Sequence, residues 1–288
     1  MMKIAYIISA YKYPEQLIRL ITRLQTDSNS FFVHVDKKTP NEIYQRMVNG
    51  TQGLSNVFYL KRHRCNWGDF GHVRATLEGI RVIVQNNLLY DYAILLTGQD
   101  YPIKSNEQIM AFFQEHYGRS FMEHFPLPSD EWEGGGLERI SHWHFYLNDH
   151  HYIFPQKGAR QFLRKFPKQL QPFGGSSYWC LTKPCIDTIY QFIKDNPGFG
   201  IYFKHVDVPD EIFFHTILMN SPHATHISND NLRYIEWRDP TSGSPAILGQ
   251  EDFVKLAASP KLFARKFDLR VDSAVLDLID QQLLFRVV

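Results

Sequence analysis

Apolar residues over the first 100 positions follow two alternating patterns. Between short apolar runs, longer segments have apolar residues at helical spacing, beginning near Pro14 and near Val73, and they predict two helices. This alternation is typical of a parallel sheet with crossover helices. The short runs, rich in β-branched and aromatic residues, predict strands over residues 4–9, 31–35, 56–60 and 92–96.

The pattern breaks between residues 126 and 158, a stretch that is rich in Gly, Trp and His. We interpret this stretch as an inserted loop. Regular periodicity then returns, so we expect one α/β domain over residues 1–288. The later elements are predicted as helices over 159–166, 184–194 and 209–219, helices from about 250 and 272, and strands over 178–182 and 232–236.

Charge and cysteine content exclude several classes of protein. The 31 Lys and Arg residues balance 30 Asp and Glu residues, so we expect no nucleic-acid partner. Cys65, Cys180 and Cys185 have no paired spacing, which predicts buried free thiols. No apolar run is long enough to span a membrane and the first residues do not form a signal peptide, so a cytoplasmic location is expected. Peripheral membrane association and the oligomeric state stay open.

Nucleotide-binding motifs are absent from the chain: it contains no Gly-x-Gly-x-x-Gly, no Walker loop and no Asp-x-Asp. A diphosphate on this kind of sheet is often held through a metal on paired aspartates, so basic side chains would have to replace the metal here. Arg265 and Lys266, which lie between Phe263 and Phe267, can do so. The alternative is that both are ordinary surface cations.

Carboxylates occupy two kinds of position that suit chemistry. Asp36 and Asp100 follow predicted strands, and strand ends are where such sheets bind ligands. Asp210 and Glu211 begin the helix predicted over 209–219. They could act on an acceptor proton, or they could cap the helix and complement its dipole.

Four histidines, His142, His144, His150 and His151, lie close together in the sequence. The spacing is compatible with a metal site, and the alternative is a set of loop histidines in a polar cleft. A serine hydrolase is not indicated, since no Gly-x-Ser-x-Gly occurs between a strand and a helix.

Taken in order, the motifs resemble those of the core-2/I-branching enzyme and peptide O-xylosyltransferase superfamily of inverting glycosyltransferases. The resemblance covers nearly the whole chain. It is carried by residues 4–10 with 33–38, by Asn66-Trp67-Gly68, and by the segments 95–105, 175–179, 210–223, 231–237 and 263–267.

The resemblance implies a GT-A-like fold, with a Rossmann-like nucleotide-binding half and a mixed central sheet flanked by helices. Residues 1–125 would bind UDP, 126–158 would be the insertion, and 159–288 would hold the acceptor and the catalytic residues. Glu211 is implied as the general base with Asp210 beside it.

Further roles follow from the resemblance. Arg265 and Lys266 are implied to bind the diphosphate. Asp36 is implied to bind the uracil, together with Ala10 at the end of the first strand. An arginine expected before residues 249–252 is missing, so Arg238 is the candidate substitute. The residues implied for the acceptor and the sugar are Trp67, Asp100, Ser177, Tyr178, Trp179 and Trp237.

The implied reaction transfers GlcNAc or xylose from a UDP-sugar to a hydroxyl of a glycan or of a peptide serine, with inversion and without a metal or other cofactor. The chain lacks the disulfide set of secretory members, so a bacterial-type enzyme that builds a surface polysaccharide is expected. Two alternatives remain: a catalytically silent glycan-binding module, and a metal-dependent hydrolase that uses the His142 to His151 cluster.

Overall fold

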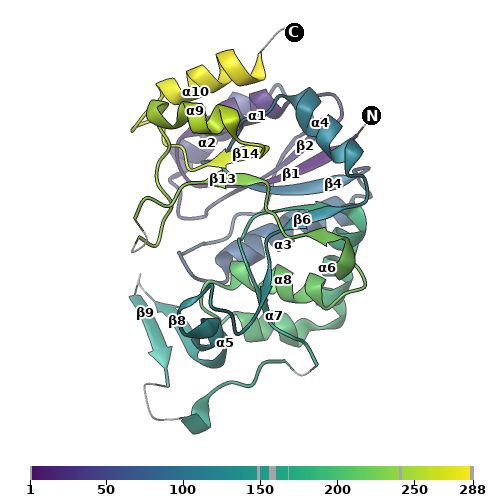
Figure 1. Ribbon diagram of the computed structural model, residues 1–288, viewed down its shortest axis with the longest axis vertical. Coiled ribbons are helices and arrows are strands. Elements are labelled where there is room, and N and C mark those ends of the chain that lie inside the picture. Colours follow the sequence, from purple (N-terminus) through teal and green to yellow (C-terminus); the bar gives the residue numbers. More distant parts are fainter. Residues whose placement is uncertain (1, 148–149, 156–159, 168, 240–241, 286–288) are drawn as a thin grey trace.

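The computed structural model describes residues 2–147, 150–155, 160–167, 169–239 and 242–285, and its centre is a mixed sheet (Figure 1). Seven strands pair in the order β12-β6-β11-β4-β1-β2-β3. β11 runs antiparallel to β4 and β6, while the other pairs are parallel. The expected α/β class with a mixed sheet is confirmed. The strands are β1 (Ile4–Ala10), β2 (Ser30–Val35), β3 (Val57–Tyr59), β4 (Tyr92–Thr97), β6 (Ser120–Met122), β11 (Trp179–Thr182) and β12 (Ile227–Ser228).

Helices cover both faces of this sheet, because alternate strand residues point to opposite faces. Tyr6 and Ile8 of β1 belong to one core, and Ala5 and Ile7 belong to the other. The first core packs under the helices α1 (Pro14–Leu24), α2 (Asn41–Thr51), α4 (Asn106–Glu115), α9 (Phe253–Ala258) and α10 (Ala274–Ile279). The second core packs under α3 (Gly71–Gln85), α6 (Lys183–Asp195), α7 (Pro197–Phe203) and α8 (Phe213–Met219), which lie on the lower side in Figure 1.

A small three-stranded sheet brings the C-terminal segment back to the carboxyl ends of β1 and β4. It has the order β13-β14-β5, formed by Arg233–Ile235, Phe263–Arg265 and Tyr101–Pro102. Arg233 fastens it to the central sheet, since its buried guanidinium donates to the carbonyl of Leu95 at 2.6 Å. Residues far apart in the sequence thus meet at one sheet edge.

The sequence predicts an inserted loop over residues 126–158, but the described part of this segment contains a helix and a hairpin. It contains α5 (Leu137–Ser141) and the strands β8 (Trp143–Leu147) and β9 (His150–Phe154), which pair antiparallel. The hairpin lies apart from the central sheet (Figure 1). The reason for the wrong prediction is that both hairpin faces carry aromatic or histidine side chains, so apolar and polar positions do not alternate.

One predicted helix is largely missing from the structure, and some of the observed helices were not predicted. Within the described part of 159–166, only a 3-10 turn over Arg160–Phe162 forms, and Ala159 lies outside the described residues. Arg164 is instead held by tertiary bonds: its guanidinium donates to the carbonyl of His205 at 2.6 Å, and its backbone N–H donates to Ser141 at 2.7 Å. The helices α2 and α4 were not predicted, although Ser105 and Gln108 form a capping box at α4.

The three cysteines are buried and free, as predicted. Among the described residues, no helix combines the length and the apolar character that a membrane-spanning helix requires.

The C-terminal helix is held against α1 by a buried carboxylate. Asp280 accepts hydrogen bonds from Tyr101 at 2.8 Å and from Arg19 at 2.7 Å, and it also pairs with Arg23 at 2.8 Å. Asp280→Asn should lower the free energy of unfolding by about 2 kcal/mol, because two partly buried guanidinium groups lose their counter-charge.

Urea unfolding followed by circular dichroism measures this loss. Asp277→Asn is the matched control, because Asp277 also pairs with Arg19 but its side chain is 58% exposed. The control should lose less than about 0.5 kcal/mol. Equal losses in the two variants would contradict the role given to burial.

Candidate functional site

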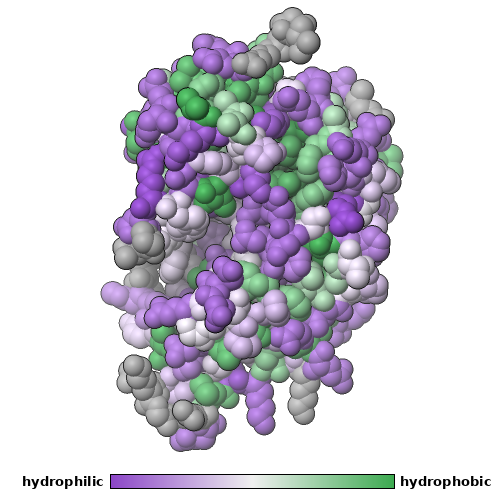
Figure 2. Space-filling view, in the orientation of Figure 1, coloured by the Kyte–Doolittle hydropathy of each residue, from purple (hydrophilic) through white to green (hydrophobic). Residues whose placement is uncertain are grey.

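A cavity of about 710 Å³ opens where the small sheet, the ends of β1, β2 and β4, and the segment before α8 meet. The surface is hollowed in this region, on the left at mid-height in Figure 2. A volume of this size holds a ligand as large as a nucleotide sugar. Of the residues predicted for the site, those that line it are Ala10, Asp36, Trp67, Ser177, Tyr178, Asp210, Glu211, Trp237, Arg265 and Lys266.

The strand ends form one wall of the cavity. Asp36 follows β2 and is 8% exposed, and its N–H donates to the carbonyl of Ala10 at 2.9 Å, so the two predicted residues are neighbours. One oxygen of the Asp36 carboxylate accepts the N–H of Lys38 at 2.7 Å. This bond fixes the orientation of the carboxylate and leaves its other oxygen for a ligand donor.

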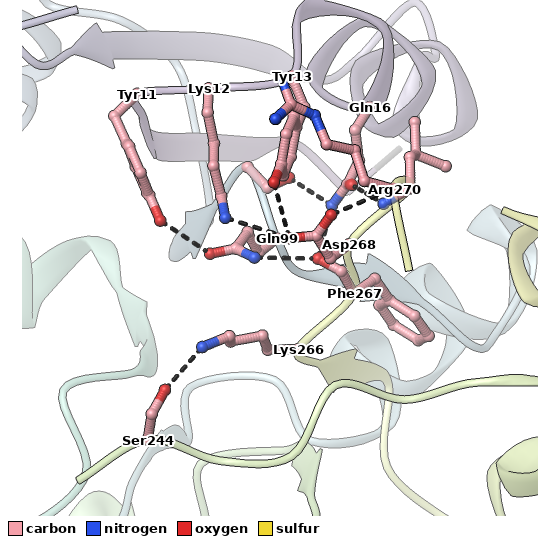
Figure 3. Close-up of polar contacts among 12 residues, drawn as sticks. Tyr11, Lys12, Tyr13, Gln16, Gln99, Ser244, Lys266, Phe267, Asp268 and Arg270 are labelled. Atoms are coloured by element: carbon pink, nitrogen blue, oxygen red, sulfur yellow. Dashed lines mark hydrogen bonds and ion pairs between the residues drawn. The ribbon is translucent and has the colours of Figure 1, made fainter. Parts of the chain in front are cut away.

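Three cations form a second wall, which we call the cation wall: Lys12, Arg265 and Lys266. Figure 3 shows Lys12 and Lys266 on opposite sides of Gln99. The Lys266 ammonium donates to the Ser244 hydroxyl at 2.6 Å. Burial and the charges of Arg265 and Lys12 lower the pKa of Lys266. Cations that disfavour one another's charge in this way favour an anion between them.

Arg265 is held in place from behind. Its Nε lies 3.2 Å from Asp100 Oδ1, and its guanidinium stacks on the Tyr178 ring at 4.2 Å. Asp100 is fully buried and does not line the cavity, so it is not placed to contact an acceptor or a sugar directly. Its other oxygen accepts the Thr97 hydroxyl at 2.7 Å. Asp100 therefore acts on the site by positioning Arg265.

Buried amides hold the chain that carries the cation wall. Gln16 and Gln99 each donate a side-chain N–H to the carbonyl of Phe267 at 3.1 Å (Figure 3). The next residue, Asp268, accepts from Tyr13 at 2.8 Å and from Lys12 at 3.2 Å. These bonds tie α1 and β4 to the segment after β14, which fixes where Lys266 lies.

The two catalytic candidates lie on a strained turn. The predicted helix over 209–219 is in fact a 3-10 turn, Pro209–Glu211, followed by α8, because Ile212 leaves the helical conformation. Val208, just before the turn, has φ +44°, an unfavourable value for a β-branched residue. Such strain is concentrated at functional sites.

Neither carboxylate makes a side-chain cap of α8 in the described part of the chain. Asp210 accepts the Ser177 hydroxyl at 2.8 Å, which brings these two predicted residues together. Glu211 accepts from Arg139 Nη2 at 2.7 Å. The capping alternative is therefore not what the structure shows.

Glu211 has the environment of a proton acceptor. Burial raises the pKa of Glu211 to about 7, against the lowering effect of the Arg139 guanidinium and with a further rise from Asp210. The Arg139 guanidinium itself stacks on the Trp132 ring at 3.9 Å, which fixes its position. A carboxylate with a pKa near neutrality can both accept and release a proton.

Exposed aromatic rings flank the opening. Trp67 and Trp237 are 69% and 57% exposed and line the cavity, as expected of surfaces that stack on flat ligands. Trp179 is not among them: it is fully buried on β11, edge-on to Phe214. Arg238 also lies outside the cavity lining and pairs with Asp252 and Glu251.

Several residues of the site, two that line the cavity and one that contacts Glu211, were not predicted from the sequence. Lys12 lies two residues beyond β1, so the rule that ligands bind at strand ends could have indicated it. Arg139 comes from the insertion, and no local signal links it to Glu211. Glu123 also faces the cavity and accepts from the Asn231 amide at 3.0 Å.

Comparisons with known proteins agree with the resemblance in the sequence motifs. The family model described as Core-2/I-Branching enzyme matches residues 4–257. Mouse xylosyltransferase 2 is 27% identical over 300 residues, which cover 96% of this chain and 33% of the mouse protein. Xylosyltransferase oxt of Drosophila melanogaster is 25% identical over 289 residues, or 93% of this chain and 32% of that protein.

The chain therefore spans about a third of the length of the curated relatives it matches. Among solved structures, a 4-diphosphocytidyl-2C-methyl-D-erythritol synthase from Anaerococcus prevotii is 11% identical, with a TM-score of 0.35 over 68% of this chain and 76% of that chain. That score is too low to support an assignment.

The Arg139 contact can be tested through the titration of Glu211. Arg139→Met should move the pKa of Glu211 above its value of about 7, because the variant removes the positive charge that stabilises the carboxylate. The pKa can be measured by pH-difference infrared spectroscopy of the carboxyl band, with Glu211→Gln as the blank. An unchanged pKa would show that Arg139 does not act on this carboxylate.

Proposed function

The chain belongs to the Core-2/I-Branching enzyme family, and we propose on that premise that it is an inverting glycosyltransferase that uses a UDP-sugar without a metal. The observation that carries the proposal is one cavity with two chemically different walls. The cation wall can neutralise a diphosphate, and a carboxylate with a pKa of about 7 can take a proton from an acceptor hydroxyl.

The donor would lie along the strand ends. Asp36 offers a fixed carboxylate oxygen to an N–H donor of the uracil ring, close to Ala10. The diphosphate would lie against Arg265 and Lys266, with Lys12 as the further cation. Lys12 takes the place given in the sequence analysis to Arg238, whose guanidinium is already paired outside the cavity lining.

Transfer would proceed by one displacement. Glu211 accepts the proton of the acceptor hydroxyl, whose oxygen forms a bond to the anomeric carbon of the sugar. The bond from that carbon to the diphosphate oxygen breaks, and UDP leaves with the electron pair. Arg265 stabilises the charge that develops on UDP, and its pairing with Asp100 holds it in place beforehand. A single displacement inverts the anomeric centre.

The donated sugar is proposed to be xylose or GlcNAc, and the acceptor a glycan hydroxyl or a peptide serine. Two facts support this range: the curated relatives are named xylosyltransferases, and the matching family is named for core-2 and I branching. Trp67 and Trp237 provide the exposed rings on which a sugar acceptor would stack.

UDP binding tests the donor site directly. UDP should bind in the presence of EDTA, and Lys266→Ala should weaken it about 10-fold or more, because a charge-assisted contact to phosphate is lost. Isothermal titration calorimetry measures both. Arg238→Ala is the matched control and should bind UDP as the wild type does. Binding that required a divalent metal would overturn the metal-free proposal.

Glu211→Gln tests the base. This variant should lose transfer by about 100-fold or more while it keeps UDP affinity, because an amide cannot accept the proton. In the wild type, kcat/KM should rise with pH up to about 7 and then level off, since Glu211 must be deprotonated to act. Transfer to a panel of acceptors can be followed by UDP release.

Asp210→Asn is the matched variant, because Asp210 is adjacent and lines the same cavity. It should keep substantially more activity than Glu211→Gln. Wild-type turnover in Glu211→Gln would refute the base assignment. Sugar binding without UDP binding in the wild type would instead favour a glycan-binding module.

A further inference from the structure

The hairpin β8–β9 brings two histidines to an aspartate outside the cavity. His144 Nδ1 lies 3.0 Å from His151 Nε2, and His151 Nε2 lies 3.9 Å from Asp207 Oδ1. One ligand atom from each of these three residues lies within 4.8 Å of the other two. We propose that these three residues, which we call the His-His-Asp cluster, form a divalent transition-metal site. The ion would link the hairpin β8–β9 to the turn Pro209–Glu211, which we call the catalytic turn.

The distances suit a small ion with nitrogen and oxygen ligands. Two ligand atoms about 2.0–2.1 Å from one zinc ion, at a tetrahedral angle, lie about 3.3 Å apart. The two distances of 3.0 and 3.9 Å fall on either side of that value. An ion between these atoms therefore needs only small side-chain movements. Three protein ligands leave the fourth position for water.

Hydrogen bonds orient the ligands as metal sites require. The Nε2 of His144 lies 3.0 Å from the carbonyl of Glu138, and a carbonyl can only accept, so this nitrogen carries the proton. The neutral ring then presents the bare Nδ1 to His151 and Asp207. In metal sites a ligand histidine usually donates its other ring N–H to a backbone carbonyl or a carboxylate, as His144 does here.

The other two ligands are also supported. The Tyr146 ring stacks on His151 at 4.4 Å with an interplanar angle of 3°, and the Tyr146 hydroxyl donates to Asp207. The nearest cation, Arg139, is bonded to Glu211 at 2.7 Å but lies 4.0 Å from Asp207. The Oδ1 atom of Asp207 that accepts the Tyr146 hydroxyl is also the oxygen 3.9 Å from His151, and its second lone pair can bind an ion.

The other two histidines that lie nearby in the sequence, His142 and His150, have different surroundings. His142 bonds the Ser141 hydroxyl at 3.2 Å, and His150 is exposed beside Tyr152. Neither belongs to the His-His-Asp cluster. The three ligands come from β8, β9 and the turn before Pro209. An ion would therefore reinforce a junction where the His144 N–H already donates to the carbonyl of His205 at 3.2 Å and the Tyr146 hydroxyl donates to Asp207.

A bound ion at this point would stabilise the position of the hairpin. A two-stranded hairpin is only marginally stable alone, and β8–β9 pairs with no other strand in the described part of the chain. Asp207 immediately precedes the strained Val208 and the catalytic turn. A metal at Asp207 would hold the hairpin, and with it Arg139 of the preceding helix, against Glu211. The site would stabilise the acceptor side and take no part in the chemical step.

Binding of Co²⁺ and Zn²⁺ to the full chain, first stripped of metal with EDTA and then gel-filtered, tests this site. Wild type should bind one equivalent of Co²⁺ with the visible absorption of a low-coordinate nitrogen and oxygen site, and Zn²⁺ should displace it. His151→Asn and Asp207→Asn should each weaken binding on the order of 100-fold. His150→Asn is the matched control and should bind as the wild type does.

Limited proteolysis gives a readout that is independent of activity. Zn²⁺ should slow cleavage within residues 143–154 in the wild type and in His150→Asn, but not in His151→Asn. Absence of saturable binding at micromolar metal, or equal affinity in His150→Asn and His151→Asn, would overturn the site. UDP binding in EDTA is measured separately, so a failure of this site and a failure of the donor site are distinguishable.

Discussion

The carbonyl of Phe267, held by two buried amides, is the contact on which the site depends. Gln16 comes from α1 and Gln99 from the end of β4, and both donate to this one oxygen. The peptide that carries Lys266 is thereby fixed above the strand ends. Without this anchor Asp36 would keep its place at the end of β2, but the cation wall would not be held beside it. The buried pair of Arg265 and Asp100 adds a second attachment within the same segment.

The two sides of the cavity are built in different ways. The side that carries Asp36 and the cation wall, where we propose that the donor binds, rests on regular elements: β1, β2, β4 and the small sheet. The side that carries Glu211, where we propose that the acceptor binds, rests on a strained turn and on Arg139, which reaches Glu211 from the insertion. One side is therefore built from paired strands, and the other from a turn and one long-range ion pair.

Much of the fold could be predicted from the sequence, because the signals are local. The periodicity of β1, α1, β2 and β4 lies within each segment, and the strand-end rule led to Asp36. The same rule correctly placed Asp100 at the end of β4, but it did not show that the side chain is buried and outside the cavity lining. Its carboxylate turns back to the Thr97 hydroxyl and to Arg265, and sequence position does not reveal such a turn.

The side of the cavity that carries Glu211 could not be predicted to the same degree. Glu211 was singled out by position and resemblance, but its partner Arg139 lies 72 residues earlier, in a segment expected to be an inserted loop. Successive side chains of β8 point to opposite faces of the hairpin. Trp143 and Phe145 stack on one face, and His144 and Tyr146 contact His151 on the other. Because neither face is uniformly apolar, the hydropathy of the sequence does not show the alternation that predicts a strand.

The return of the C-terminal segment to the first strand has a consequence for synthesis of the protein. Lys12 leaves the ribosome more than 250 residues before Arg265, Lys266 and the anchoring carbonyl of Phe267. The parallel strands β1, β2 and β4 are therefore synthesised well before the cation wall can assemble. The wall is complete only after β14 has docked beside β5.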